Sequence, residues 1–293
     1  MPKKLTIVSA VSLVLLIGVI ALAVKLSEKK TPSGVPARIS VYDKNAGTIF
    51  TPTYEDFLAG CVEGLLIKGV DFEPEALKAI AAAENTRIKY FLKIKSGFEN
   101  LGADLSVNEY IPYSPKEPSE AAKAAAKDAL KLELTFEGEP FNAPICKIST
   151  GRTDDCPPYS PSIGLPCDVD APYYSGSTAA TVEEVSAALG GTNMAFDGTE
   201  WFHDPVYGDN GTLLFIAFGN EKISGETLRT ALGLRSTAIS TEYTEDKFMF
   251  RCQGWGDNRG MSVYAANYLA QHGKTAEEIL DIFYPDAKLK AAK

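Results

Sequence analysis

The feature that most constrains this chain is an uninterrupted apolar run, Leu5–Val24, which contains no charged residue. In a helix that rises about 1.5 Å per residue, a run of this length spans about 30 Å, the thickness of the hydrocarbon core of a bilayer. An apolar stretch of this length is typical of a transmembrane helix. We therefore expect a single membrane anchor at residues 5–24.

The residues around this run suggest how the chain is oriented. Lysines flank the run at both ends, so the usual asymmetry of positive charge does not decide the orientation. A short tail (1–4) before a long acidic body favours a cytoplasmic tail and an extracytoplasmic body in a single-pass cell-membrane protein. Residues 25–36 are polar, contain Pro and Gly, and predict a linker.

A cleaved signal peptide is the alternative, because Ala21-Leu22-Ala23 resembles a cleavage site. The body would then be secreted. The apolar run is longer than a usual signal-peptide core, which favours the uncleaved anchor.

The charge of the body excludes one class of partner. The chain has 29 basic and 38 acidic residues, and residues 1–30 hold five of the basic residues but only one acid. The remainder carries a net charge of −13, and its basic residues form no stripe. Such a body repels nucleic acid, so we expect no nucleic-acid partner.

The cysteines and histidines give little support for a metal site. The five cysteines show no CxxC spacing, and the chain has only two histidines. We therefore expect neither a bound metal nor another cofactor. Cys156 and Cys167 are candidates for a disulfide, although buried free thiols explain them equally well.

The body, residues 37–293, mixes helical and strand patterns without regular βαβ spacing, which predicts an α+β fold. Helices are expected at Thr53–Leu66, Pro74–Ile94, Ser119–Leu130, Thr181–Leu189, Ser224–Leu232, Gly260–Gln271 and Thr275–Phe283. Strands are expected within Ala37–Phe50 as a hairpin, and at Leu132–Phe136, Ala143–Ser149, Leu213–Phe218, Thr237–Thr241 and Lys247–Gln253. The Pro-rich segment Cys156–Tyr174 predicts a loop.

Three blocks carry a resemblance to a known family. The first is Tyr54–Thr86 (YEDFLAGCVEGLLIKGVDFEPEALKAIAAAENT), the second is Phe141–Thr153 (FNAPICKISTGRT), and the third is the C-terminal series SGETLRTALGLRST, GWGDNRGMSVYAANYLAQHG and EEILDIFYPDAKL. In their order and spacing these blocks resemble the stage II sporulation protein D family. The resemblance covers about residues 40–289.

The resemblance implies an extracytoplasmic domain with a substrate groove, active in sporulation. It also implies a lytic transglycosylase acting on denuded peptidoglycan strands, which lack their stem peptides. Its implied partners are these glycan strands and proteins that remodel the septal wall. The reaction needs a carboxylic acid that protonates the leaving oxygen and then acts as a base.

The acid that the family uses is missing from this chain. The family places its glutamate in an E-M-P tripeptide after the first helix. The matching position is Leu65 when counted from Gly60, and Ile67 when counted back from Glu75. Glu63 is the only carboxylate nearby and is out of register in both counts. It is the candidate catalytic residue, and a solvated surface glutamate is its simpler interpretation.

Other family residues are also replaced. The family loop usually reads G-x-G-H-G-V-G-M-S-Q-Y-G-A, and Asp257 stands here in place of its histidine. Ser106 stands where some members have a zinc-binding cysteine, and Asn85 where the family has an arginine. The residues that the resemblance assigns to substrate binding are Glu75, Lys78, Arg235, Ser236, Asp257, Met261, Ser262 and Tyr264. Glu75 and Lys78 also suit a helix surface, and Arg235 a structural ion pair.

Three functions follow from these observations. A catalytically impaired relative that binds peptidoglycan or wall-remodelling partners explains both the retained scaffold and the missing acid. An active transglycosylase would need a displaced carboxylate such as Glu63, Asp71 or Asp257. A structural envelope protein would need no groove chemistry at all. We favour the first hypothesis.

Overall fold

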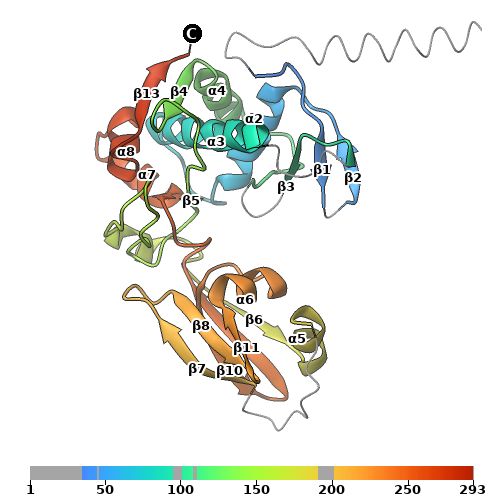
Figure 1. Ribbon diagram of the computed structural model, residues 1–293. Coiled ribbons are helices and arrows are strands. Elements are labelled where there is room, and N and C mark those ends of the chain that lie inside the picture. Colours follow the sequence, from blue (N-terminus) through green and yellow to red (C-terminus); the bar gives the residue numbers. More distant parts are fainter. Residues whose placement is uncertain (1–34, 45, 95–100, 108–110, 191–200, 293) are drawn as a thin grey trace, which may run out of the picture.

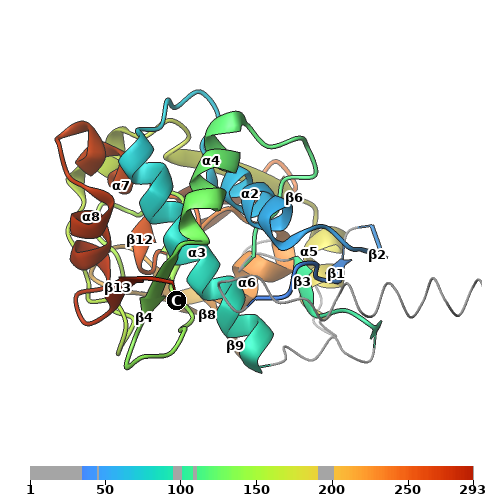
Figure 2. The same ribbon diagram turned by 90° about the horizontal axis from the view of Figure 1, so that it is seen from above.

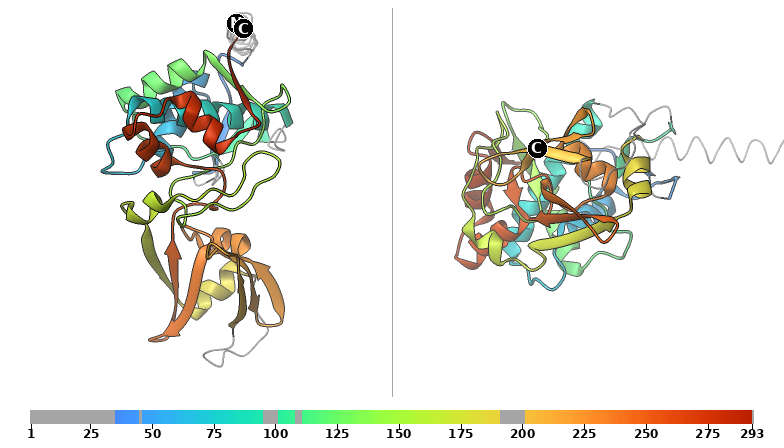
Figure 3. Two further views of the ribbon diagram at one scale, coloured as in Figure 1. Left: turned by 90° about the vertical axis from the view of Figure 1, so that its left-hand side faces the viewer. Right: turned by 90° about the horizontal axis from the view of Figure 1, so that it is seen from below.

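The computed structural model describes residues 35–44, 46–94, 101–107, 111–190 and 201–292. The chain forms two lobes (Figure 1). A helical lobe is built from the first and last parts of the sequence, and a β lobe is built from the residues between them. Extended segments join the lobes (Figure 3).

The expected fold class needs one correction. Among the described residues, none of the helices combines the length and the apolar character needed to cross a bilayer. Helix α3 (Pro74–Ile94) is long enough but carries six charged side chains, which would oppose its insertion. The expected anchor at Leu5–Val24 and most of the linker at 25–36 lie outside the described residues. The structure is therefore mixed α+β, without a membrane-spanning helix in its described part.

The helical lobe packs its helices around α3 (Figure 2). The other helices are α2 (Tyr54–Leu65), α4 (Glu120–Ala129), α7 (Val263–Gln271) and α8 (Ala276–Phe283). Three small sheets complete the lobe: β1 (Val41–Asp43) with β2 (Thr48–Phe50) and β3 (Leu105–Val107), β4 (Leu132–Thr135) with β13 (Lys288–Ala291), and β5 (Ile145–Cys146) with β12 (Met261–Ser262).

Helix α3 is buried on all sides along its middle because most of its residues there are alanine. The small side chains of Ala79–Ala83 let the neighbouring helices approach closely. One side of α3 packs in a hydrophobic core with α7 and α8, and the other in a core with α2 and α4. Asn85 links the neighbours, because its side chain accepts a hydrogen bond from the Tyr54 hydroxyl (2.9 Å) and donates one to the Ala129 carbonyl (3.1 Å).

The β lobe contains two three-stranded antiparallel sheets. The strands in sheet order are β10 (Ala238–Thr244), β11 (Lys247–Gln253) and β6 (Ser175–Ala180), and then β7 (Phe202–Tyr207), β8 (Leu213–Phe218) and β9 (Glu221–Ser224). Helices α5 (Val182–Ala188) and α6 (Gly225–Leu232) contribute to the same core. Phe248, Phe250 and Cys252 alternate inward along β11, as the two-residue period of a strand requires.

Most expected elements are confirmed, and their ends differ by a few residues. Thr53, Thr181 and Thr275, the first residues of the expected helices, are the N-caps of α2, α5 and α8. Gly233 ends α6 in the left-handed conformation at a φ of 61°. The expected strand at Ala143–Ser149 was wrong in length, because only Ile145 and Cys146 pair with β12. All five cysteines are free thiols.

Candidate functional site

The glycine-rich loop Gly256–Ser262 packs directly against the backbone of the strand β5 region. A Cβ atom at Gly260 would lie 2.0 Å from the Pro144 carbonyl oxygen, and Gly260 has a φ of +66°. A Cβ atom at Gly256 would lie 2.8 Å from the Cys146 Cβ. These glycines are therefore required by close backbone approach and left-handed geometry, and their role is to hold the loop against β5.

The two positions that match the missing family acid are buried and aliphatic. Leu65 is 3% exposed and belongs to the core between α3 and α8. Ile67 is 2% exposed and packs in a small cluster with Ile148 and Ala171, against the partly buried rings of Trp255 and Tyr264. Ile67 therefore belongs to an apolar cluster that Trp255 and Tyr264, from the glycine-rich loop region, pack against, and its side chain cannot transfer a proton.

Glu63 is engaged elsewhere. One of its carboxylate oxygens accepts hydrogen bonds from the Ser119 backbone N–H at 3.0 Å and from the Ser119 hydroxyl at 2.8 Å. Ser119 is the N-cap of α4. The carboxylate thus satisfies groups at the start of a helix, where negative charge is favourable.

Glu75 and Lys78 both lie on α3, outside the loop region. The Glu75 carboxylate accepts a hydrogen bond of 2.6 Å from the Ala276 N–H, in the first turn of α8. Lys78 is partly exposed. The pKa of the Asp128 carboxyl on α4 is lowered mainly by the hydrogen bond from Lys131, and the charge of Lys78 lowers it further. Both residues therefore have neighbours that belong to the helical scaffold.

Four of the expected binding residues lie in or near the loop, and three of them are buried. Met261 is fully buried in the helical core, and Ser262 caps α7 by accepting the Ala265 N–H. Ser236 is 1% exposed and accepts the Ala238 N–H. Tyr264 is only partly buried and borders a hollow of about 460 Å³ with Tyr268.

Asp257, at the position of the family histidine, faces a different space. It borders a cavity of about 150 Å³ together with Arg87, Arg229 and Arg259. Its carboxylate accepts the Arg259 N–H at 3.2 Å. Burial raises the pKa of the Asp257 carboxyl.

A cluster of two aromatic rings and two cations lies near Ile67. The Lys147 Nζ is 4.5 Å from the centre of the Trp255 ring, and the Arg235 guanidinium carbon is 4.7 Å from it. Tyr173, 51% exposed, meets Trp255 edge to face at 6.4 Å. We call Lys147, Tyr173, Arg235 and Trp255 the Trp255 cluster. Of the expected binding residues, Arg235 is in this cluster and Tyr264 packs with Trp255 around Ile67.

Lys147 is partly buried, and this burial changes the pKa of its ammonium group. Burial lowers the pKa of the Lys147 ammonium to about 8. Among the residues that the structure describes, no carboxylate lies within 4 Å of Lys147 or Arg235, so the ion pair expected for Arg235 is not formed there. Arg235 instead donates to the Ser175 carbonyl at 3.1 Å.

Asp168 is a buried acid that sequence reasoning missed. It lies in the short helix η2 (Pro166–Asp170) and accepts the Ser149 N–H at 2.8 Å. Burial raises the pKa of its carboxyl to about 6, although hydrogen bonds with Ser149 and Ser262 act in the opposite direction. Asp168 therefore joins the loop to the segment after β5. No local pattern marked it, because its burial depends on residues far along the chain.

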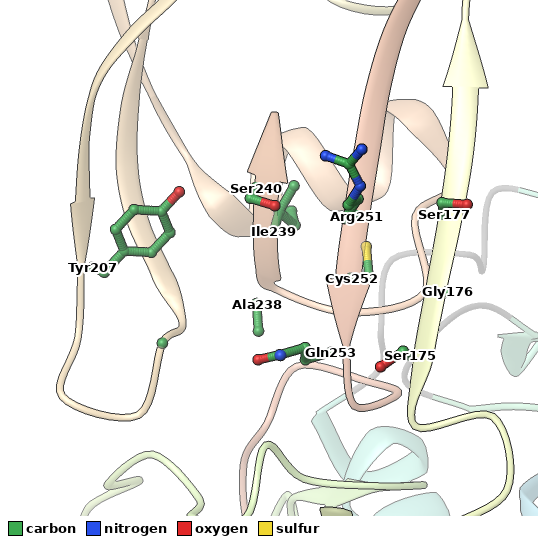
Figure 4. Close-up of a pocket in the computed structure, with 11 residues that line it drawn as sticks. Ser175, Gly176, Ser177, Tyr207, Ala238, Ile239, Ser240, Arg251, Cys252 and Gln253 are labelled. Carbon is green, nitrogen blue, oxygen red and sulfur yellow. The ribbon is translucent and has the colours of Figure 1, made fainter. Parts of the chain in front are cut away.

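The β lobe has a separate polar cavity of about 590 Å³ (Figure 4). Residues of the three neighbouring strands β6, β11 and β10 line it, among them Ser177, Arg251 and Ser240, together with Tyr207. Trp201 is buried in the β-lobe core. Within the described ranges, no group of three or more His, Cys, Asp or Glu side chains is arranged to hold a metal ion.

Comparison with known proteins gives the family. No protein-family model matches the chain. Over 286 residues it is 26% identical to the stage II sporulation protein D of Bacillus subtilis (strain 168), covering 90% of this chain and 82% of that protein. It is also 26% identical over 286 residues to the stage II sporulation protein D of Bacillus amyloliquefaciens, covering 90% of this chain and 80% of that protein. The chain is therefore a diverged member of the stage II sporulation protein D family.

Proposed function

We propose that this sporulation-associated protein of the stage II sporulation protein D type binds the glycan strands of peptidoglycan without cleaving them. The single observation that carries the proposal is the position of Ile67. It packs beside Trp255 and Tyr264, next to the retained loop, at one of the two positions that match the family acid. Its side chain has no proton to give.

The carboxylates near the expected site support the same conclusion. Glycan cleavage needs an acid that reaches the leaving oxygen at hydrogen-bonding distance. The Glu63 carboxylate is bound to Ser119, and Asp168 is fully buried. Asp257 faces a cavity of about 150 Å³, which is smaller than the pockets that usually bind small molecules.

The surface beside Ile67 retains groups suited to binding. Aromatic rings present flat apolar faces with polar edges, and Tyr173 and Trp255 offer two such rings at the junction of the lobes. We propose that the body acts outside the cytoplasm, where glycan strands are present. A second part of the proposal is that bound protein recruits wall-remodelling partners to the septum.

The test combines a binding assay and a cleavage assay on the full chain. Purified protein is incubated with denuded glycan strands and with whole sacculi, and an established lytic transglycosylase serves as the positive control. We expect the protein to cosediment with sacculi and mass spectrometry to detect no anhydro-sugar products. Product release that survives repurification would overturn the proposal, as would a failure to cosediment.

An active transglycosylase with a displaced carboxylate is the second candidate. The observation that favours it is Asp168, because a carboxyl with a pKa of about 6 can hold a proton near neutral pH. Its burial means that the loop would have to open before substrate reached it. If products are found, Asp168→Asn and Glu63→Gln variants separate the two carboxylates, since only the one that donates the proton would abolish turnover.

A further inference from the structure

The Trp255 cluster holds two positive charges that the described part of the protein leaves without a carboxylate. The Lys147 Nζ and the Arg235 guanidinium carbon lie 4.5 and 4.7 Å from the Trp255 ring centre. By contrast, Lys93, Lys123, Lys131 and Lys274 all form ion pairs with acidic side chains. A partly buried cation without a counter-charge is unfavourable in the free protein.

The structure holds these cations in place. The Lys147 N–H donates to the Trp255 carbonyl at 2.9 Å, and the Trp255 N–H donates to the Ile148 carbonyl at 2.7 Å. Gly176 leaves space for Arg235, because a Cβ atom there would lie 2.3 Å from the Arg235 Nη1. The cluster is therefore a fixed arrangement rather than a set of long side chains in solvent.

We infer that Lys147, Arg235 and Trp255 form a subsite that binds a carboxylate carried by the glycan strand. The inference rests on the proposed function and adds the chemical group that is recognised. A sugar ring would pack against the exposed Tyr173 ring, and its carboxylate would form charge-assisted hydrogen bonds with the Lys147 ammonium and the Arg235 guanidinium. The ligand would supply the counter-charge that the described residues lack.

Two carboxylates on peptidoglycan share this chemistry. One is the lactyl carboxylate of a muramyl sugar, which is free only when the stem peptide has been removed. The other belongs to the stem peptide itself. The test uses three probes: denuded strands, strands that keep their stem peptides, and denuded strands whose lactyl carboxyl has been converted to a neutral methylamide.

Binding is measured with the full chain by titration, using tryptophan emission as a second readout. The chain has two tryptophans, and Trp201 is 4% exposed in the β-lobe core, so a change on glycan addition reports on Trp255. We expect wild-type protein to bind a carboxylate-bearing strand roughly tenfold or more tightly than the methylamide. Tight binding of denuded strands assigns the lactyl group, and tight binding only of peptide-bearing strands assigns the stem peptide.

The variants test the assignment of residues. K147M/R235M should bind both kinds of strand as weakly as wild type binds the methylamide, while K131M, which also removes one surface lysine charge, should keep the preference. Gly176→Ala keeps both charges but displaces Arg235, so it should lose part of the preference. Gly164→Ala, whose Cβ would have no atom nearer than 3.8 Å, is its control. Thermal melting confirms that each variant is folded.

Two results would overturn the inference and leave the proposed function intact. One is equal wild-type binding of the carboxylate and methylamide strands. The other is a preference for the carboxylate that K147M/R235M retains. Absence of binding to every probe would instead overturn the proposed function and the subsite with it.

Discussion

The Glu63 carboxylate and Ser119 form a two-bond contact at the start of helix α4. The same oxygen accepts the Ser119 N–H at 3.0 Å and the Ser119 hydroxyl at 2.8 Å. The Ser119 hydroxyl in turn accepts the Ala122 N–H at 3.3 Å. Glu63, at the end of α2, therefore completes the capping of α4, which gives a structural reason for an acid at this position.

Removing this contact should cost stability. We expect Glu63→Ala to lower the free energy of unfolding by about 1–2 kcal/mol, because an N-cap group loses its acceptor. Combined with Ser119→Ala in a double-mutant cycle, the two changes should be less than additive. Urea denaturation measures each variant, and Glu221→Gln on the exposed start of β9 is the control. Additive effects would show that the two residues act independently.

The loop glycine Gly260 should tolerate substitution poorly for two separate reasons. It has a φ of +66°, which costs an L-residue about 1–2 kcal/mol, and a Cβ would overlap the Pro144 carbonyl. Gly273 has a φ of +84°, but a Cβ atom there would have no other atom within 4 Å. The Gly273→Ala variant therefore measures the cost of the left-handed backbone without a steric clash. We expect Gly260→Ala to lose more stability than Gly273→Ala in urea denaturation. Equal losses would mean that the loop moves away from Pro144 easily.

Most helices in both lobes were predictable because helix signals are local. A hydroxyl residue before an amphipathic run accepts an N–H two or three residues later, whatever the rest of the fold. Thr53, Thr181 and Thr275 follow this rule. Glu226 and Arg229 are three residues apart on α6, a spacing at which helical side chains are neighbours, and they form two hydrogen bonds of 2.7 and 2.8 Å.

The β lobe and the site were less predictable because they depend on distant residues. Strand β6 (SGSTAA) has no apolar alternation, and it is a strand because β11 pairs with all six of its residues. Lys147 and Arg235 are far apart in sequence and meet only at Trp255. The one sequence feature that could have indicated this cluster is Trp255, which stands directly before the glycine-rich loop.

The buried Glu84–Arg87 pair on α3 offers a third test. Both side chains are almost fully buried, and each has one polar atom without a hydrogen bond in the described structure. Removing one partner leaves an uncompensated buried charge, so Arg87→Met should cost about 3–5 kcal/mol. Burial raises the pKa of the Glu84 carboxyl, and the charge and hydrogen bond of Arg87 oppose this rise.

The loss in Arg87→Met should also depend on pH. Without Arg87 the folded protein keeps Glu84 protonated to higher pH than the unfolded chain does, so stability should fall further as the pH rises. Glu84→Gln combined with Arg87→Met removes the charge and should restore part of the stability at pH 8. Urea denaturation at pH 5 and pH 8 measures both variants. If Arg87→Met lost the same free energy of unfolding at both pH values, the ionisation of Glu84 would not be the cause of the loss.

Asp168 should give the protein a pH dependence of the opposite sign to that of an ion-paired acid. The pKa of its carboxyl is about 6 in the folded state, above the value of about 3.9 for an unfolded chain. Between these values the folded state holds a proton that the unfolded state has released. Its contribution to stability is therefore complete below pH 4 and is lost as the pH rises through 6, by roughly 3 kcal/mol.

The Asp168→Asn variant isolates this contribution from that of the other acids. Asparagine keeps an oxygen that can accept the Ser149 N–H, which Asp168 accepts at 2.8 Å, but it does not titrate. We expect wild type and variant to differ by a constant amount below about pH 3, and the variant to gain relative stability from about pH 4 to about pH 6. Urea denaturation at one-unit intervals measures this difference. If the difference did not change with pH, Asp168 would titrate normally, and the second candidate function would lose the acid on which it depends.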